Sequence, residues 1–187
     1  MSFTTVGGSS ILTIFAVLCF VVFALLSLST AKANSNLTTK STDATTNYYK
    51  ADVILIANNA MLQDKAMQVA FKLATPPGVT LSMKSLDGAA AVINNPKHAS
   101  RTIMVITKTM KDAEYVIDKT GDAVKEVLMG GLRSGAGKKQ IDMNSYMGEE
   151  DIAVMNRLEG QGIHLFMQAD PTSKKLSCED IRRNYNR

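Results

Sequence analysis

Short apolar runs alternate with amphipathic stretches along the chain from residue 51 onward. The first run, "DVILIA" at residues 52–57, is rich in β-branched side chains and is followed by Asn58 and Asn59. This composition is typical of a strand that is buried on both faces. Similar runs predict further strands at residues 79–83, 102–107, 125–129, 140–143 and 163–169.

Amphipathic stretches between these runs predict helices. After the first strand, Met61, Met67 and Phe71 recur at near-helical spacing, with Asn58 or Asn59 as the N-cap, until "TPPG" stops the helix. Further helices are predicted at residues 85–93, 109–119 and 149–159. Alternating strands and helices predict an α/β fold with an open, mostly parallel sheet, doubly wound or closely related, and helices on both faces.

The first thirty residues follow a different pattern. Residues 11–29 contain no charged side chain and have about the 20-residue length of a membrane-spanning helix. We therefore expect residues 1–30 to form an uncleaved anchor. A cleaved signal peptide is the alternative, because residues 31–33 (Ala-Lys-Ala) match the cleavage pattern, although the apolar run is long and no basic residue precedes it.

The flanks of this run orient the expected anchor. Lys32, Lys40 and Lys50 follow it and no basic residue precedes it, which places the rest of the chain on the cytoplasmic side as a single-pass protein. Residues 31–50 are rich in Thr, Ser and Asn and are expected to form a polar linker. The remaining expected divisions are an α/β domain at 51–175 and a C-terminal tail at 176–187.

Charge and cysteine content narrow the class of protein. The net charge of +4 is spread along the chain without a basic block, and Trp is absent, so nucleic acid is not an expected partner. Cys19 and Cys178 are the two cysteines, too few for a disulfide framework or a cysteine zinc site. We expect a reducing compartment for the folded part, with no metal and no cofactor.

A glycine-rich stretch, "GGLRSGAGKKQ" at residues 130–140, follows one predicted strand. A nucleotide-binding P-loop has four residues between its glycines and Ser or Thr after its lysine, and it opens a helix. Here five residues separate Gly131 from Gly137, Lys139 follows Lys138, and a strand is predicted next. In open α/β sheets ligands bind beyond the carboxyl ends of strands. The stretch is thus either a phosphate-binding turn or only a connecting turn.

Three segments resemble one known family in the same order. They are "ATPPGV" with the residues that follow it up to Asp118, "VLMGGLRSGAGKKQI", and "GEEDIAVMNRLEGQGIHLFMQADPTSKK". Together they resemble the IIB component of the mannose, fructose and sorbose class of the bacterial phosphoenolpyruvate-dependent sugar phosphotransferase system (PTS). The resemblance extends from about Ala51 to Lys175.

This resemblance implies a phosphoryl relay. In the family a histidine accepts a phosphoryl group from the IIA component and passes it to a sugar that arrives through the membrane components IIC and IID. It also implies that the protein acts at the cytoplasmic face of the bacterial inner membrane. As a further partner it implies another copy of the same chain, in a homo-oligomer. By position, the phosphate-binding candidates are Gly130, Gly131, Arg133 and Ser134.

The family's carrier histidine lies in a loop of the form D-x-R-L-I-H-G-Q-V, which this chain lacks. Counting back without gaps places that histidine near Thr38. The first family strand is also expected to be missing, so the chain resembles a truncated IIB fused to an anchor, with a seam near Lys50. The chain's own histidines, His98 and His164, are predicted to be surface residues away from the glycine-rich stretch.

Three hypotheses remain at this point. The chain is a IIB component with impaired phosphotransfer, a non-catalytic membrane-tethered binding or regulatory module derived from IIB, or a marginally stable product of recombination. The sequence does not identify the sugar.

Overall fold

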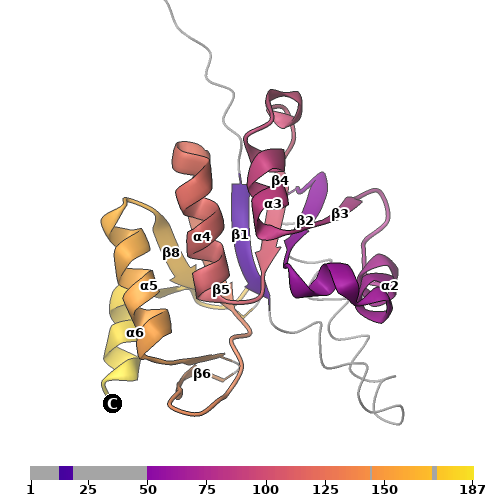
Figure 1. Ribbon diagram of the computed structural model, residues 1–187. Coiled ribbons are helices and arrows are strands. Elements are labelled where there is room, and N and C mark those ends of the chain that lie inside the picture. Colours follow the sequence, from indigo (N-terminus) through magenta and orange to yellow (C-terminus); the bar gives the residue numbers. More distant parts are fainter. Residues whose placement is uncertain (1–12, 19–49, 144, 170–171) are drawn as a thin grey trace, which may run out of the picture.

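A twisted, mostly parallel sheet forms the centre of the molecule (Figure 1). The computed structural model describes residues 13–18, 50–143, 145–169 and 172–187. The strand order is β3-β2-β4-β1-β5-β8-β9, in which β1 is Thr13–Leu18. Apart from β1, its strands are β2 (Val53–Ala57), β3 (Thr80–Lys84), β4 (Ile103–Thr107), β5 (Val124–Gly130), β8 (His164–Met167) and β9 (Leu176–Ser177), of which only β9 pairs antiparallel. The predicted α/β fold is confirmed.

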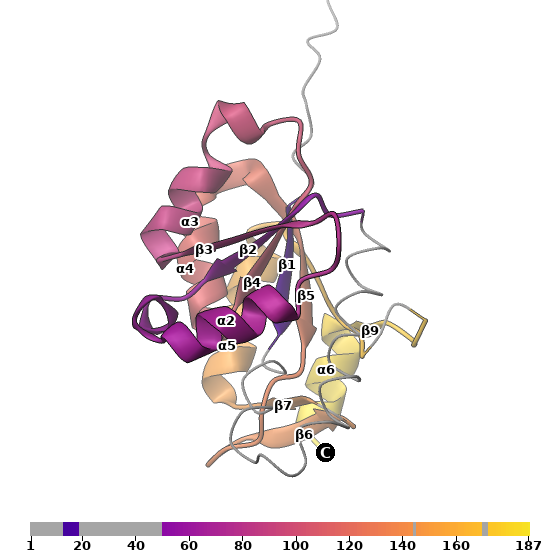
Figure 2. The same cartoon turned by 90° about the vertical axis from the view of Figure 1, so that its right-hand side faces the viewer.

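Helices cover both faces of the sheet, and alternate residues of β2 point into a different core cluster on each face. The larger core cluster joins Val53 and Leu55 of β2 to residues of α3 (Leu86–Ile93), α4 (Met110–Thr120) and α5 (Glu149–Gly160). These three helices lie side by side in Figures 1 and 2. Ile54 and Ile56 belong to a second cluster, against which α2 (Lys65–Leu73) packs. Both faces of β2 are therefore buried, as its uninterrupted apolar run predicts.

Capping side chains set where the helices begin. Ser85 and Thr109 accept hydrogen bonds from backbone N–H groups in the first turns of α3 and α4, which matches the predicted starts. The prediction that Asn58 or Asn59 caps the first α-helix is wrong, because a 3-10 turn at Ala60–Gln63 comes first and Asp64 caps α2. Both asparagines still accept hydrogen bonds from backbone N–H groups nearby, Asn59 from that of Leu86 at 2.9 Å.

The first strand, β1 (Thr13–Leu18), lies in the middle of the sheet. It pairs in parallel with β4 on one side and with β5 on the other, and its last residue, Leu18, is in register with Gly130. The sheet therefore has no gap where the first family strand was expected to be missing, and a seam near Lys50 is not supported. The central strands of parallel sheets and membrane helices are both typically uninterrupted apolar runs, so apolarity alone did not distinguish the two.

The predicted single-pass anchor is likewise not supported. Residues 13–18 of the apolar run form a strand, and no helix among the described residues is both long and apolar enough to cross a membrane. The rest of the run at 19–29, the expected linker up to residue 49, and Thr38 lie outside the described residues.

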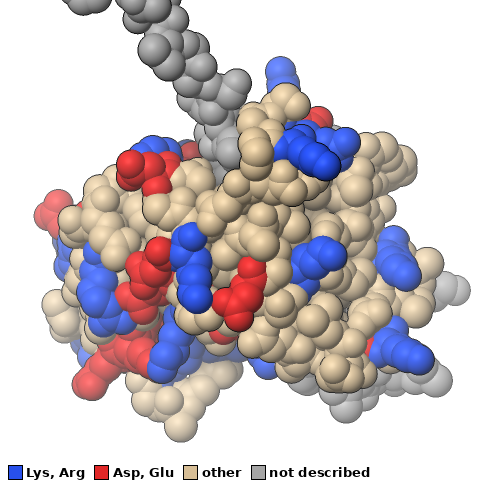
Figure 3. Space-filling model, turned by 45° about the horizontal axis from the view of Figure 1, so that its top comes forward, with Lys and Arg blue, Asp and Glu red and all other residues tan. Residues whose placement is uncertain are grey.

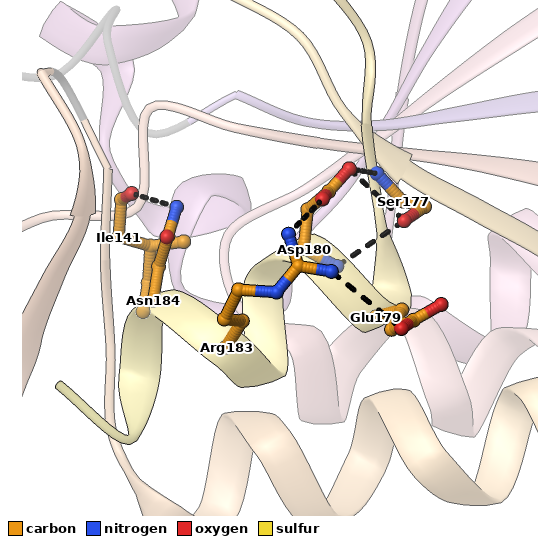
Figure 4. A network of polar contacts seen from close by, with 6 residues as sticks. All are labelled: Ile141, Ser177, Glu179, Asp180, Arg183 and Asn184. Atoms are coloured by element: carbon orange, nitrogen blue, oxygen red, sulfur yellow. Dashed lines mark hydrogen bonds and ion pairs between the residues drawn. The ribbon is translucent and has the colours of Figure 1, made fainter.

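The C-terminal residues, expected to form a tail, include β9 and the helix α6 (Cys178–Tyr185). Cys178 and Ile181 are buried in the larger core cluster. Around them, Figure 4 shows Asp180 bound to Ser177 at the start of the helix, and Asn184 donating a hydrogen bond to the carbonyl of Ile141 at 3.1 Å. Residues 176–187 are therefore packed against the domain, because Cys178 and Ile181 are one helical turn apart and share an apolar face.

Candidate functional site

The glycine-rich stretch joins the end of β5 to a hairpin of β6 (Lys139–Asp142) and β7 (Ser145–Met147), seen below the sheet in Figure 2. Gly131 and Gly137 have φ angles of 61° and 73°, which glycine adopts without steric cost. Leu132 between them is buried, and its carbonyl accepts a hydrogen bond from the N–H of Tyr146 at 2.8 Å. Because the stretch leads into a strand, it differs from a P-loop, which opens a helix.

An open cleft with a volume of about 810 Å³ lies beyond the carboxyl ends of β4 and β5. Three segments line it: the β4–α4 connection, the glycine-rich stretch and the start of α5. The lining residues are Lys108, Thr109, Lys111, Leu132, Arg133, Ser134, Ala136, Gly137, Lys138, Gly148, Glu149, Glu150 and Asp151. Its position is the one where open α/β sheets bind ligands.

Ion pairs across the cleft neutralise part of its charge. Lys111 Nζ lies 3.1 Å from Glu150 Oε1, and Lys138 Nζ lies 2.8 Å from Asp151 Oδ2. Lys108 forms no ion pair with any residue that the structure describes, and it lines the cleft beside the N-terminus of α4. A cation and the N-terminal end of a helix both favour a negatively charged ligand.

The structure brings together two of the four predicted phosphate-binding residues. Arg133 and Ser134 line the cleft, whereas Gly130 and Gly131 shape the chain next to it and are not among the lining residues. Sequence reasoning missed Lys108 and Thr109, which follow the buried strand β4. Applying the rule about carboxyl ends to every predicted strand, and not only to the glycine-rich one, would have found them.

Both histidines lie at the opposite edge of the sheet. His98 ends a 3-10 turn that precedes β4, and His164 is the first residue of β8, in register with Glu126 of β5. Glu126 is four residues before Gly130, roughly 13 Å along an extended strand. The predicted distance of His98 and His164 from the glycine-rich stretch is therefore confirmed.

His164 has partners of its own at that edge. Its Nδ1 lies 3.6 Å from Glu126 Oε1, and its ring stacks on Phe166 with centroids 5.5 Å apart. The imidazole is largely exposed, as predicted for the outward face of this strand. The described residues contain no group of three or more His, Cys, Asp or Glu side chains suited to a metal ion.

The open, mostly parallel sheet with a polar cleft at its carboxyl edge defines the protein as an open-sheet α/β domain with a candidate ligand-binding site. The family model described as "PTS system sorbose subfamily IIB component" matches residues 39–186. The chain belongs to this family of sugar phosphotransferase system IIB components.

Two curated relatives illustrate the match. The mannose-specific EIIAB component of Escherichia coli (strain K12) is 27% identical over 128 residues, which cover 68% of this chain and 39% of that protein. The sorbose-specific EIIB component of Lacticaseibacillus casei is 26% identical over 133 residues, covering 70% of this chain and 80% of that protein. This chain thus spans about two fifths of the E. coli relative.

Solved structures share the fold. The IIBSor domain of the sorbose permease from Klebsiella pneumoniae superposes with a TM-score of 0.72 at 21% identity, covering 77% of this chain and 88% of that one. The N-acetylgalactosamine-specific IIB component 1 from Escherichia coli gives a TM-score of 0.71 at 16% identity, covering 88% and 97%.

Proposed function

We propose that this chain is a IIB-type component whose cleft binds the phosphoryl group that is relayed from a IIA component to a sugar taken up through IIC and IID. The observation that carries the proposal is the cleft itself, which gathers Lys108, Arg133 and Ser134 at the carboxyl edge of the sheet. Family membership supplies the relay as its context.

The lining residues suit a phosphoryl group in different ways. A lysine ammonium such as Lys108 acts as a point charge, whereas the guanidinium of Arg133 presents a planar set of donors that matches phosphate oxygens. The hydroxyl of Ser134 can donate one more hydrogen bond. In phosphoryl transfer the charge spreads over the equatorial oxygens, so fixed donors and cations around them stabilise the transition state.

The position of the histidines favours a second candidate function. The chain's two histidines, His98 and His164, both lie at the amino edge, away from the cleft, and the sequence lacks the family's D-x-R-L-I-H-G-Q-V loop. Transfer through a histidine of this chain is impaired on this view. The second candidate is therefore a non-catalytic binding or regulatory module that keeps the cleft and a surface for IIA, IIC or IID.

A phosphotransfer experiment separates these two candidates. The full chain is incubated with phosphoenolpyruvate and the general and IIA phosphocarrier proteins of its system, and intact mass is measured under alkaline conditions that preserve phosphohistidine. A gain of one phosphoryl group that is lost in His98→Gln or His164→Gln identifies a working relay. No gain, while a IIB protein with the family loop is labelled, supports the binding module.

A second measurement tests the cleft without requiring transfer. Inorganic phosphate is titrated into the isotopically labelled chain, and amide shifts are followed by NMR. We expect shifts at residues 108–111 and 131–138 that weaken in Lys108→Gln and Arg133→Gln. They should persist in Lys125→Gln, because Lys125 is an exposed residue at the amino end of β5, whereas the cleft lies at its carboxyl end. Amide shifts that fall elsewhere in the chain, or that are unchanged in Lys108→Gln and Arg133→Gln, would exclude phosphate binding in the cleft.

A further inference from the structure

Basic residues are distributed unevenly along the described chain. Residues 50–108 contain seven Lys and Arg but three Asp and no Glu, whereas residues 109–187 contain twelve Lys and Arg and thirteen Asp and Glu. Every ion pair among the described residues takes its basic partner from residues 111–187. In Figure 3, Lys and Arg on the left lie among Asp and Glu, and those on the right stand mostly apart. The half that carries β2, β3 and α2 is therefore the basic half.

Within this basic half, α2 carries an unusual exposed surface. The helix has no buried residue, whereas α3, α4, α5 and α6 each bury at least two. Val69 and Leu73 are 53% and 82% exposed, and one helical turn separates them. Lys65 and Lys72 are exposed beside them, and Leu62 of the preceding 3-10 turn is 39% exposed. We call these five residues the α2 outer face.

We propose that the α2 outer face docks on the anionic surface of a lipid bilayer. Leucine and valine side chains enter the boundary between headgroups and acyl chains, while neighbouring lysines contact lipid phosphates. The cytoplasmic loops of membrane proteins are themselves enriched in Lys and Arg, so they do not complement Lys65 and Lys72. Nucleic acid offers no apolar counterpart to Leu73. The positive charge of Lys65 and Lys72 and the exposed apolar side chain of Leu73 together favour an anionic lipid surface over the other two partners.

This docking is peripheral and reversible. A nine-residue helix with two lysines buries little apolar area and gains modest electrostatic attraction, so it holds the domain at the surface without inserting it. The inference does not depend on phosphotransfer by the chain. It concerns a different surface from the cleft, and its test uses lipid alone.

Vesicle flotation of the full chain tests the proposal. Vesicles of phosphatidylcholine with and without 30 or so mole per cent phosphatidylglycerol are compared, at about 0.1 M and about 0.5 M salt, where screening differs strongly. We expect binding to the anionic vesicles that weakens at high salt. Lys65→Gln combined with Lys72→Gln should lower the partition coefficient roughly 30-fold, because each lysine near such a surface contributes about 1 kcal/mol.

The control variant removes the same charge elsewhere. Lys125 and Lys174 are exposed residues of the C-terminal half, and their replacement by Gln should leave binding nearly unchanged. Because all variants share the apolar N-terminal residues, any binding through those residues cancels in the comparison. Leu73→Ser should also weaken binding several-fold, while circular dichroism verifies that each variant is folded. Equal binding by the wild type and the α2 variants would overturn the proposal and leave the surface to an acidic protein partner.

Discussion

Lys138 reaches from the glycine-rich stretch to Asp151 in the first turn of α5, with Nζ and Oδ2 2.8 Å apart. The same carboxylate accepts a hydrogen bond from the N–H of Gly148 at 3.0 Å. One carboxylate thus caps α5 and ties the glycine-rich stretch to it. Because only 14% of the Asp151 side chain is exposed, water compensates poorly for a lost partner.

Replacing Lys138 with Met should lower the free energy of unfolding by about 1–2 kcal/mol, the cost of leaving a mostly buried acceptor with fewer partners. Urea denaturation measures this change. Lys125→Met is the matched control, since its ion pair with Asp122 is largely exposed and should contribute less than about 1 kcal/mol. Equal losses of unfolding free energy in Lys138→Met and Lys125→Met would show that the contact between Lys138 and Asp151 does not stabilise the glycine-rich stretch.

The glycines of the stretch should differ in their tolerance of alanine. Gly137 has a φ of 73°, so Gly137→Ala should cost about 1–2 kcal/mol through steric strain in the left-handed region. Gly130 has no positive φ, and an added Cβ would meet the carbonyl oxygen of Gln168 at an ordinary 3.5 Å. We expect Gly130→Ala to leave the free energy of unfolding within about 0.5 kcal/mol of the wild type. Thermal or urea unfolding of both variants checks the contrast, and a larger loss for Gly130→Ala would contradict it.

The sequence correctly predicted those strands and helices whose burial in the fold agrees with the hydrophobic pattern of their own residues. The apolar run before Asn58 became β2, and Ser85 and Thr109 cap helices where expected. Arg133 and Ser134, which the resemblance and the rule about strand ends singled out, line the cleft, and their binding of phosphate stays a prediction. In each case a local signal and the fold agree, which is typical of natural sequences.

The wrong or missing predictions concern residues whose structure depends on contacts with parts of the chain that are distant in sequence. The segment at 13–18 is as apolar as a membrane helix, and only its pairing with β4 and β5 identifies it as a central strand. Lys108 carries no motif, and it joins the cleft because parallel strands end at a shared edge. The helix α6 is short and mostly polar, and two buried residues decide its packing.

An ion pair between α4 and α5 should make stability depend on pH in acid. Arg157 donates two hydrogen bonds to Glu114, at 2.6 and 2.9 Å, and the Glu114 side chain is 15% exposed. The guanidinium holds the pKa of Glu114 below its usual value of 4.5. A lowered pKa in the folded state means that the pair stabilises the protein above about pH 4.5, and that this contribution is lost as the pH falls through the folded-state pKa.

Glu114→Gln should therefore be less stable than the wild type at pH 7, by about 1 kcal/mol, and the difference should shrink towards pH 3. Urea denaturation across this pH range measures it. Glu179→Gln serves as the control, because Glu179 is 83% exposed in its pair with Arg183. A difference that stays constant with pH would mean that the charge of Glu114 does not contribute.

The thiol of Cys178 should react slowly in the folded protein. The residue is 5% exposed, and burial raises the pKa of its thiol to about 11. Since the thiolate is the nucleophile, alkylation by iodoacetamide at pH 8 should be at least about 100-fold slower than for an unperturbed thiol. Peptide mapping of Cys178 in the native chain and in urea measures the two rates, with glutathione as the reference. Fast labelling without denaturant would contradict the packing of α6.

Removal of the N-terminal residues tests whether β1 is part of the domain. A fragment of residues 51–187 corresponds to the α/β part expected from sequence together with its C-terminal residues, but it lacks the strand between β4 and β5. Without β1, the facing edges of β4 and β5 lose their backbone hydrogen-bond partners, and buried unpaired groups cost about 1–3 kcal/mol each.

We expect this fragment to show no cooperative thermal transition, whereas a chain that lacks only residues 1–10, which precede β1, should unfold like the full-length protein. Circular dichroism and calorimetry of the three proteins at equal concentration make the comparison. A cooperative transition for residues 51–187, with the stability of the full chain, would mean that the sheet forms without β1 and that the first fifty residues are dispensable for the fold. Loss of the transition in the fragment alone places residues 11–50 within the folding unit, because their removal then costs more than the few kcal/mol by which a small domain is stable.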